Sequence, residues 1–213
     1  MLSIMEYVLG FFSVGAVALL GAMSPGPDFA MVVKNAVISS KRAGIVTALG
    51  VATGCLVHAT YSIIGIGTLV SQSILAFTIV KWLGAIYLLY LGLNMLFSKK
   101  TEGAKEVFSQ TSPNTTLITS FREGFLTNVL NPKATLFFLA IFTQVININT
   151  PFVLKVAYGL EVAVLVGIWF SILTLFLNVT YFKNLLTRSL HRVEQAMGAV
   201  LVLLAGKVAL EQR

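Results

Sequence analysis

The sequence predicts an all-α membrane protein that crosses the bilayer six times, and three observations support this prediction. Hydrophobic residues make up 57% and charged residues 11% of the 213 residues, whereas about a quarter of a soluble domain is charged. Long stretches carry no charge, among them 7–27 and 43–80, and a transmembrane helix needs about 20 apolar residues. These stretches are apolar on every face and do not alternate, which argues against the strands of a membrane barrel.

The six predicted spans follow from where the charge-free runs end. They cover Tyr7–Ser39, Gly44–Val70, Ile74–Phe97, Gly124–Ile146, Phe152–Val179 and Val193–Leu210. The 38 residues from 43 to 80 carry no charge, and this run is too long for one helix crossing the bilayer. Ser71-Gln72-Ser73 is therefore predicted to form the turn between the second and third spans.

The chain is predicted to form a single membrane domain, 1–213, built from two halves. Residues 1–97 hold the first three spans, 98–118 form a polar cytoplasmic loop, and 119–213 hold the last three spans. Because each half has an odd number of spans, the second half enters the bilayer in the opposite direction. The segments 82–92 and 196–206 share a Gly-Ala pair followed by a glycine seven residues after the alanine. We therefore expect two inverted three-helix repeats.

The basic residues predict the orientation of the spans. Cytoplasmic loops of membrane proteins carry an excess of lysine and arginine. The gaps at 39–43, 98–122 and 181–192 contain nine such residues, and the gaps at 71–73 and 147–151 contain none. The nine are Lys41, Arg42, Lys99, Lys100, Lys105, Arg122, Lys183, Arg188 and Arg192. Both termini are therefore expected outside the cytoplasm. The net charge of +7 follows this topology, so the expected partner is the lipid bilayer and not a nucleic acid.

The first span is interrupted by Ser24-Pro25-Gly26-Pro27-Asp28. The two prolines lack amide hydrogens, so the carbonyls four residues earlier lose their helical partners. Such carbonyls are tolerated in a bilayer only where they face protein or a wet cavity. Ser24 is predicted to be an N-cap, with Pro25 at the first helical position. The span should therefore consist of two half-helices, the second of which starts near Ser24.

The fourth span repeats this arrangement in Asn131-Pro132-Lys133. Asn131 is expected to cap the second half-helix and Pro132 to occupy its first position. Superposing the two breaks places Asp28, the only aspartate of the chain, opposite Lys133. Counted from the cytoplasmic side, Asp28 lies eleven positions from Ser39 and Lys133 lies eleven positions from Arg122. At the rise of an α-helix this is about 16 Å, which is close to the middle of the bilayer.

Asp28 and Lys133 are open to two interpretations. A charge at the centre of a membrane helix costs at least ~2.5 kcal/mol, so neither is expected to face lipid. In the first interpretation they form a structural ion pair that holds the two halves together. In the second they bind a zwitterion, with Asp28 at the ammonium and Lys133 and the half-helix N-termini at the carboxylate. The candidate substrate-binding residues are Ser24, Pro25, Gly26, Pro27, Asp28, Asn131, Pro132 and Lys133.

His58 is expected on the same face of the second span as Gly50 and Gly54, because the three residues are spaced four apart. Gly50-x-x-x-Gly54 allows another helix to approach closely, either within one subunit or between the subunits of a homo-oligomer. His58 either donates a hydrogen bond to that neighbouring helix or carries protons, since an imidazole titrates near neutral pH.

Other chemical groups within the spans are few. Glu161 in the fifth span is interpreted as an ion-pair partner of Lys155 or Lys81 in preference to a proton-linked carboxylate. Cys55 is the only cysteine, which excludes a disulfide within the chain. One aspartate cannot form an aspartyl dyad, and no His/Cys cluster has metal-ligand spacing. Neither an enzyme nor a bound metal or cofactor is expected.

Several stretches resemble one known family. They are SPGPDFAMVVKNAVISSKRAGIVTALG at 24–50, VKWLGAIYLLYLG at 80–92, FREGFLTNVLNPKATLFFLAIF at 121–142 and HRVEQAMGAVLVLLAGKVAL at 191–210. The family is the LysE/RhtB family of bacterial amino-acid exporters. The resemblance implies a small secondary transporter of the inner membrane that exports amino acids, driven by the proton motive force. The two motifs of the family match 25–28 and 131–133. A histidine in the second span, here His58, resembles the branch of the family that exports homoserine, threonine and other neutral amino acids.

Two functional hypotheses follow. In the first, the chain is an amino-acid exporter whose site lies between the two breaks, where Asp28 and Lys133 recognise the charges of the substrate and His58 carries the coupled proton. In the second, the chain is a passive channel for small solutes or an accessory membrane subunit, and the pair of Asp28 and Lys133 is purely structural.

Overall fold

The computed structural model describes residues 4–97, 116–146 and 150–177, together with 192, 195, 196, 198–203, 205 and 206. Within this part of the chain the secondary structure is helical and contains no strand. The elements are α1 (Ile4–Met23), α2 (Pro27–Lys34), a π-helix η1 (Asn35–Ser39), α3 (Lys41–Gln72), α4 (Ile74–Leu96), α6 (Leu117–Val129), α7 (Pro132–Val145) and α8 (Phe152–Phe176). The predicted all-α class is confirmed.

Three single helices are long and apolar enough to cross a membrane, over Lys41–Ile66, Thr78–Leu96 and Phe152–Phe176. Two further spans are bent pairs. The pair α1 and α2 with η1 bends by 60°, and the pair α6 and α7 bends by 57°. The described residues thus hold up to five spans, and the first and fourth are broken as predicted. The sixth predicted span, Val193–Leu210, lies largely outside the described residues.

The helix boundaries differ from the predicted ones where charges lie near a helix end. α6 begins at Leu117, with the hydroxyl of Thr116 accepting a hydrogen bond from the amide of Thr119 at 3.2 Å. The predicted fourth span began seven residues later, at Gly124, and the last two residues of the predicted loop 98–118 are helical. A hydropathy pattern stops at the first charges, whereas a capped helix continues through them. The predicted turn Ser71-Gln72-Ser73 is shorter in the structure, because α3 continues to Gln72. Ser73 alone separates the two helices, and its hydroxyl caps α4 by accepting from the amide of Ala76 at 3.1 Å.

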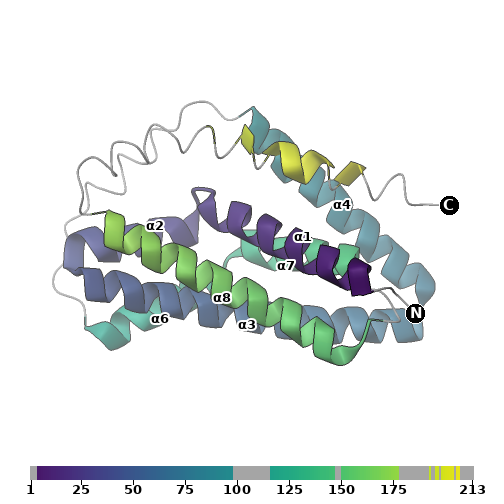
Figure 1. Cartoon of the computed structure of the whole chain (residues 1–213), viewed down its shortest axis with the longest axis horizontal. Coiled ribbons are helices and arrows are strands. Elements are labelled where there is room, and N and C mark those ends of the chain that lie inside the picture. The colour runs from purple at the N-terminus through teal and green to yellow at the C-terminus, as the bar shows by residue number, and fades with distance from the viewer. Residues whose placement is uncertain are drawn as a thin grey trace.

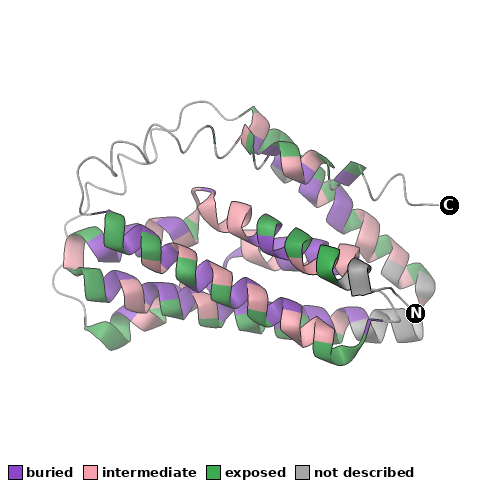
Figure 2. Cartoon of the chain, in the orientation of Figure 1, coloured by how far each residue is buried: buried purple, intermediate pink, exposed green. Residues whose placement is uncertain are grey.

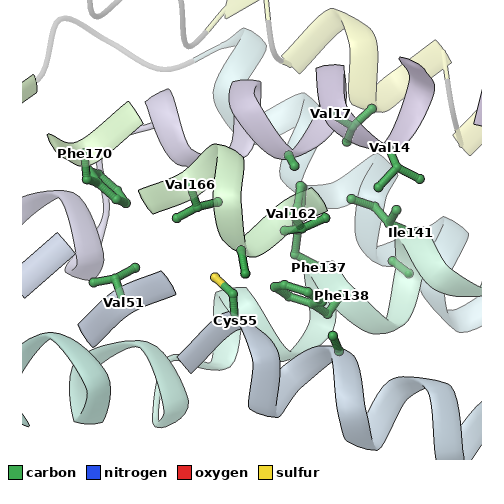
Figure 3. Close-up of a cluster of buried hydrophobic side chains, with 14 of the residues drawn as sticks. Val14, Val17, Val51, Cys55, Phe137, Phe138, Ile141, Val162, Val166 and Phe170 are labelled. Atoms are coloured by element: carbon green, nitrogen blue, oxygen red, sulfur yellow. The ribbon is translucent and has the colours of Figure 1, made fainter. Parts of the chain in front are cut away.

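The core lies between α1, α3, α7 and α8, which run side by side along the length of the molecule (Figure 1). Figure 3 shows side chains from these four helices pointing toward one another. They are Val14 and Val17 of α1, Val51 and Cys55 of α3, Phe137, Phe138 and Ile141 of α7, and Val162, Val166 and Phe170 of α8. The outer faces carry large apolar side chains that are mostly exposed, such as Phe12 at 73% and Ile64 at 62% (Figure 2). An apolar core inside an apolar surface is what a bilayer requires.

Small residues bring the helix backbones close together. A Cβ added at Gly50 would meet the backbone of α6 at Phe121 and would lie 2.8 Å from the amide nitrogen of Phe125. On the other side of the same contact, a Cβ at Gly124 would meet the carbonyl of Thr47. α3 and α6 thus pack backbone against backbone, and Gly50 lies at a contact within the subunit.

The third span packs against the last part of the chain. A Cβ at Gly92 of α4 would lie 2.8 Å from the carbonyl oxygen of Gly198, and one at Gly198 would lie 2.6 Å from the carbonyl oxygen of Gly92. Figure 1 shows the described segments near the C-terminus, in yellow, alongside α4. These glycines belong to the two similar stretches 82–92 and 196–206. The inverted repeat itself stays a prediction.

Candidate substrate site between the two helix breaks

The first break differs in detail from its prediction. α1 ends at Met23, and Gly26, not Ser24, is the N-cap of α2, with Pro27 at the first helical position. The first backbone hydrogen bond of α2 runs from the amide of Ala30 to the carbonyl of Gly26 at 2.9 Å. The predicted cap at Ser24 is therefore wrong. Two prolines separated by one residue leave an extended residue between them, and the helix starts only at the second proline.

The second break follows its prediction. Asn131 is the N-cap of α7, and its side-chain oxygen accepts a hydrogen bond from the amide of Lys133 at 3.0 Å. Pro132 occupies the first turn of α7. Since the side chain of Asn131 faces the first break, the N-termini of both half-helices approach one region of the protein. The partial positive charge at such termini attracts anions.

Asp28 is bound by two amides. Its Oδ2 accepts hydrogen bonds from the side-chain nitrogens of Asn128 at 2.9 Å and Asn131 at 3.2 Å. Its Oδ1 is buried and has no hydrogen-bond partner among the described residues. Asp28 thus connects α2 to the end of α6 and to the start of α7, and its Oδ1 accepts no hydrogen bond from the described residues.

Lys133 reaches across to the first break. Its Nζ donates a hydrogen bond to the hydroxyl of Ser24 at 2.8 Å, and a Cβ placed on Gly26 would lie 3.5 Å from the same nitrogen. Ser24, which does not cap a helix, therefore has a different role from the predicted one. The carboxylate of Asp28 takes its hydrogen bonds from amides and the ammonium of Lys133 donates to a hydroxyl, so the two charges belong to one network of neutral partners.

A cavity of about 60 Å³ lies between the two breaks. A site of this size with polar partners has room for several water molecules. Its polar wall contains Ser24, Asp28, Asn128, Asn131 and Lys133. The remaining wall is mainly apolar and comes from α1, α7 and α8, with Ala18, Ala22, Phe137, Val162, Val166 and Phe170 among its residues. Gly26 and Pro27 of the predicted site also line the cavity, whereas Pro25 and Pro132 shape the breaks.

His58 is fully buried behind this cavity and bonded through both ring nitrogens. Its Nε2 lies 2.9 Å from the backbone carbonyl oxygen of Asn128, and its Nδ1 contacts the hydroxyl of Tyr61. A carbonyl oxygen can only accept, so Nε2 carries the proton, and Nδ1 of the neutral ring accepts from Tyr61. The ring also stacks on Phe138 at a centroid distance of 5.4 Å. Gly54, one turn earlier, makes room for the side chain of Asn128.

Glu161 does not form the ion pair that the sequence suggested. Among the described residues the ion pair is that of Lys34 and Glu123, and neither Lys155 nor Lys81 forms one with Glu161. Its Oε1 lies against Gly15 of α1, where a Cβ would be 2.6 Å away, and its Oε2 is buried without a hydrogen-bond partner among the described residues. Glu161 is thus a membrane-embedded carboxylate at the contact of α1 and α8.

Sequence reasoning missed three residues around the cavity. Asn128 binds both Asp28 and His58, Tyr61 binds His58, and Cys55 contributes to the lining. Asn128 had a usable signal, because a polar amide four residues before a proline in a membrane span requires a partner. The part of the chain that the structure describes holds no group of three His, Cys, Asp or Glu side chains able to bind a metal.

Two broken spans, with half-helix N-termini and opposite charges around one cavity, are typical of membrane transporters. The family comparison agrees. The model of the family described as "LysE type translocator" matches residues 19–212, and the chain therefore belongs to this family of membrane translocators, as its sequence motifs suggested.

Individual relatives cover about two thirds of the chain. An uncharacterised membrane protein, YrhP, from Bacillus subtilis is 36% identical over 138 residues, which are 62% of this chain and 66% of that protein. A protein named leucine efflux protein from Salmonella choleraesuis is 31% identical over 147 residues, 68% of each chain, and the protein of that name from Salmonella typhimurium matches equally. No solved structure matches the chain.

Proposed function

We propose that this protein is a secondary active exporter of neutral amino acids with apolar side chains. The observation that supports the proposal most directly is the cavity with a charged polar wall at the two helix breaks and an apolar wall opposite it. A zwitterionic amino acid with an apolar side chain likewise has a charged end and an apolar end. Its carboxylate suits Lys133 and the half-helix N-termini, and its ammonium suits the oxygen of Asp28 that accepts no hydrogen bond from the described residues.

The apolar wall supports a leucine-like side chain. Val162, Val166 and Phe170 of α8 and Phe137 of α7 offer no hydrogen-bonding side-chain group to a substrate hydroxyl. Burying a hydroxyl without a partner has a free-energy cost, so the cavity suits leucine better than the homoserine or threonine expected from His58. Some of the relatives are named leucine efflux protein, and this name agrees with the proposed preference for leucine.

We further propose that transport is coupled to protons through His58. Protonation at Nδ1 would turn this nitrogen from an acceptor into a donor, and the hydroxyl of Tyr61 would have to rotate. The Nε2 side of the ring is bonded to the carbonyl of Asn128, whose side chain binds Asp28. A proton on His58 therefore acts on the group that would hold the substrate ammonium. Glu161 is a second candidate for the coupled proton.

We also propose how the protein is placed and assembled in the membrane. The protein lies in the bacterial inner membrane with both termini on the periplasmic side. Residues 1–97 and 119–213 form two inverted three-helix repeats, and a homo-oligomer is an alternative to a monomer. A passive channel or accessory subunit, in which Asp28 and Lys133 form a purely structural pair, is the competing function.

Counterflow in proteoliposomes tests the proposed export activity. Vesicles loaded with unlabelled leucine should accumulate labelled leucine at a rate that saturates with concentration, because a carrier exchanges its substrate at a site. Leucine, isoleucine and valine should compete with the label better than threonine, homoserine or lysine. Uptake that rises linearly and ignores the internal leucine would identify a channel. No uptake of any of these amino acids would remove the proposed substrate class.

His58→Ala should reduce leucine efflux by about tenfold or more while the protein still folds, since the substitution removes the hydrogen bond from α3 to the backbone of Asn128 at the second break and the contact with Tyr61 on α3 itself. The measurement is efflux from preloaded vesicles at several pH values, with Thr60→Val as a control, because Thr60 is exposed on the same helix. If His58→Ala retains both the rate and its pH dependence, the histidine is a packing residue and the proton role is excluded.

A further inference from the structure

A second polar cluster lies within the membrane helices, away from the cavity. The side-chain nitrogen of Asn35 donates two hydrogen bonds of 2.8 Å, one to the hydroxyl of Thr47 on α3 and one to Oε2 of Glu123 on α6. The other oxygen of Glu123 lies 4.0 Å from Nζ of Lys34. We call Lys34, Asn35, Thr47 and Glu123 the polar cluster. It joins three separate helical elements through one amide.

Asn35 and Thr47 form the buried centre of the polar cluster, and the backbone is irregular there. Asn35 is 1% exposed and Thr47 is 0% exposed. Asn35 is the first residue of the π-helix η1, in which its carbonyl accepts from the amide of Ser40 at 3.1 Å, five residues later. Its side-chain oxygen has no hydrogen-bond partner among the described residues. Single π-helical turns are frequent at functional sites, because the extra residue redirects a side chain.

The polar cluster and the cavity lie on the same three elements, one above the other. α2, α3 and α6 each line the cavity, with Asp28, Cys55 and Asn128. Lys34 on α2, Thr47 on α3 and Glu123 on α6 are six, eight and five positions away from these lining residues, or roughly 8–12 Å along the helix axes. The cluster lies toward the ends of α2 and α6 that are predicted to face the cytoplasm, which Figure 1 shows together at one end of the molecule.

We propose that the polar cluster is the cytoplasmic gate of the transport pathway, held closed in this structure by Asn35. The proposal rests on the proposed function, in which the cavity is the substrate site. For substrate to enter from the cytoplasm, α2 and η1 must separate from α3 and α6, and this separation breaks both hydrogen bonds of Asn35. α3 and α6 stay together, because their backbones are in contact at Gly50 and Gly124. The half-helix α2 with η1 is therefore the moving part.

The composition of the cluster suits a contact that must open. When the contact opens, water from the cytoplasm can replace the hydrogen bonds of the Asn35 amide. Apolar side chains in the same place could not form such hydrogen bonds with water. The one ion pair is long, at 4.0 Å, and both of its side chains are about a quarter exposed, so it contributes little to closure. Asn35 is the residue whose loss should open the gate.

Cys55 provides the measurement, because it is the only cysteine and it lines the cavity. Its alkylation by a membrane-impermeant maleimide can be followed in inside-out vesicles, where the reagent meets the cytoplasmic face, and in right-side-out vesicles. Asn35→Ala should raise the rate in inside-out vesicles about tenfold, the factor expected from the loss of two hydrogen bonds of the closed state. The rate in right-side-out vesicles should stay the same or fall.

Two variants separate a gate from a structural clamp. Glu123→Gln keeps an oxygen that can accept from Asn35 but removes the charge, so it should raise the rate in inside-out vesicles by a smaller factor. Arg122→Gln changes a neighbouring exposed residue of α6 and should leave the rate as in the unmodified protein. An unchanged rate in Asn35→Ala would overturn the proposal. So would an equal increase from both faces, which indicates a loosened fold.

The labelling needs no substrate, so the gate and the proposed function can fail separately. If leucine counterflow is absent but Asn35→Ala increases labelling only from the cytoplasmic face, the substrate class is wrong and the gate is supported. If counterflow is present but the labelling of Cys55 does not respond to Asn35→Ala, the exporter is supported and the gate lies elsewhere.

Discussion

Replacing Asp28 with asparagine and Lys133 with glutamine together should abolish leucine efflux without unfolding the protein. Both substitutions keep the size and polarity of the side chains in the cavity wall, and Ser24, Asn128 and Asn131 remain available as hydrogen-bond partners. The substrate, however, would lose a charged partner at each end. Hydrogen bonds to charged groups contribute about 1.5–3 kcal/mol each, so the rate should fall by at least about a hundredfold. Efflux of labelled leucine and the elution profile of the purified variant measure the two effects.

The exchange of the two charges is the stricter test of the same site. Asp28→Lys with Lys133→Asp preserves a pair of opposite charges, so a purely structural pair would tolerate it. A substrate site would not, because each new charge would face the wrong end of the zwitterion and the N-terminal field of its half-helix would act on the opposite sign. Efflux close to that of the unmodified protein in either double variant would leave the breaks with a structural role alone. Arg42→Gln, an exposed substitution, serves as the control.

Gly50→Ala should destabilise the protein strongly, whereas Gly65→Ala on the same helix should not. A Cβ at Gly50 would meet the backbone of α6, which cannot move aside as a flexible side chain would. A Cβ at Gly65 would meet no atom of the described residues within 4 Å apart from the adjacent backbone of its own helix. Overpacking of this kind costs about 1–3 kcal/mol and sometimes more. Alanine is also the better helix former by up to ~1 kcal/mol, which favours Gly65→Ala.

The comparison of the two glycine variants is made by thermal unfolding in detergent, followed by size-exclusion chromatography. The melting temperature of Gly50→Ala should fall by several degrees, or the variant should fail to accumulate, and that of Gly65→Ala should stay or rise. Equal melting temperatures would show that α3 and α6 do not pack as closely as in this structure. The close contact at Gly50 would then not explain why α3 and α6 remain together when the proposed gate opens.

Much of the fold could be predicted from the sequence, because the signals that determine it are local. Long apolar runs require helices in a bilayer, and prolines interrupt hydrogen bonds within their own helix. The breaks near Pro27 and Pro132 and the cap at Asn131 follow from these rules. The rules place a break to within a few residues only, so Ser24 was assigned a cap that Gly26 provides.

The contacts of the site were decided by the tertiary structure. The sequence by itself placed Asp28 and Lys133 at matching depths, but their hydrogen bonds go to Asn128, Asn131 and Ser24. These partners come from the opposite halves of the chain, about a hundred positions away. Which side chains meet depends on how the bent helices pack, and no periodicity along one helix contains that information. Depth in the membrane can therefore be predicted from the sequence, whereas the hydrogen-bond partners are decided by how the helices pack.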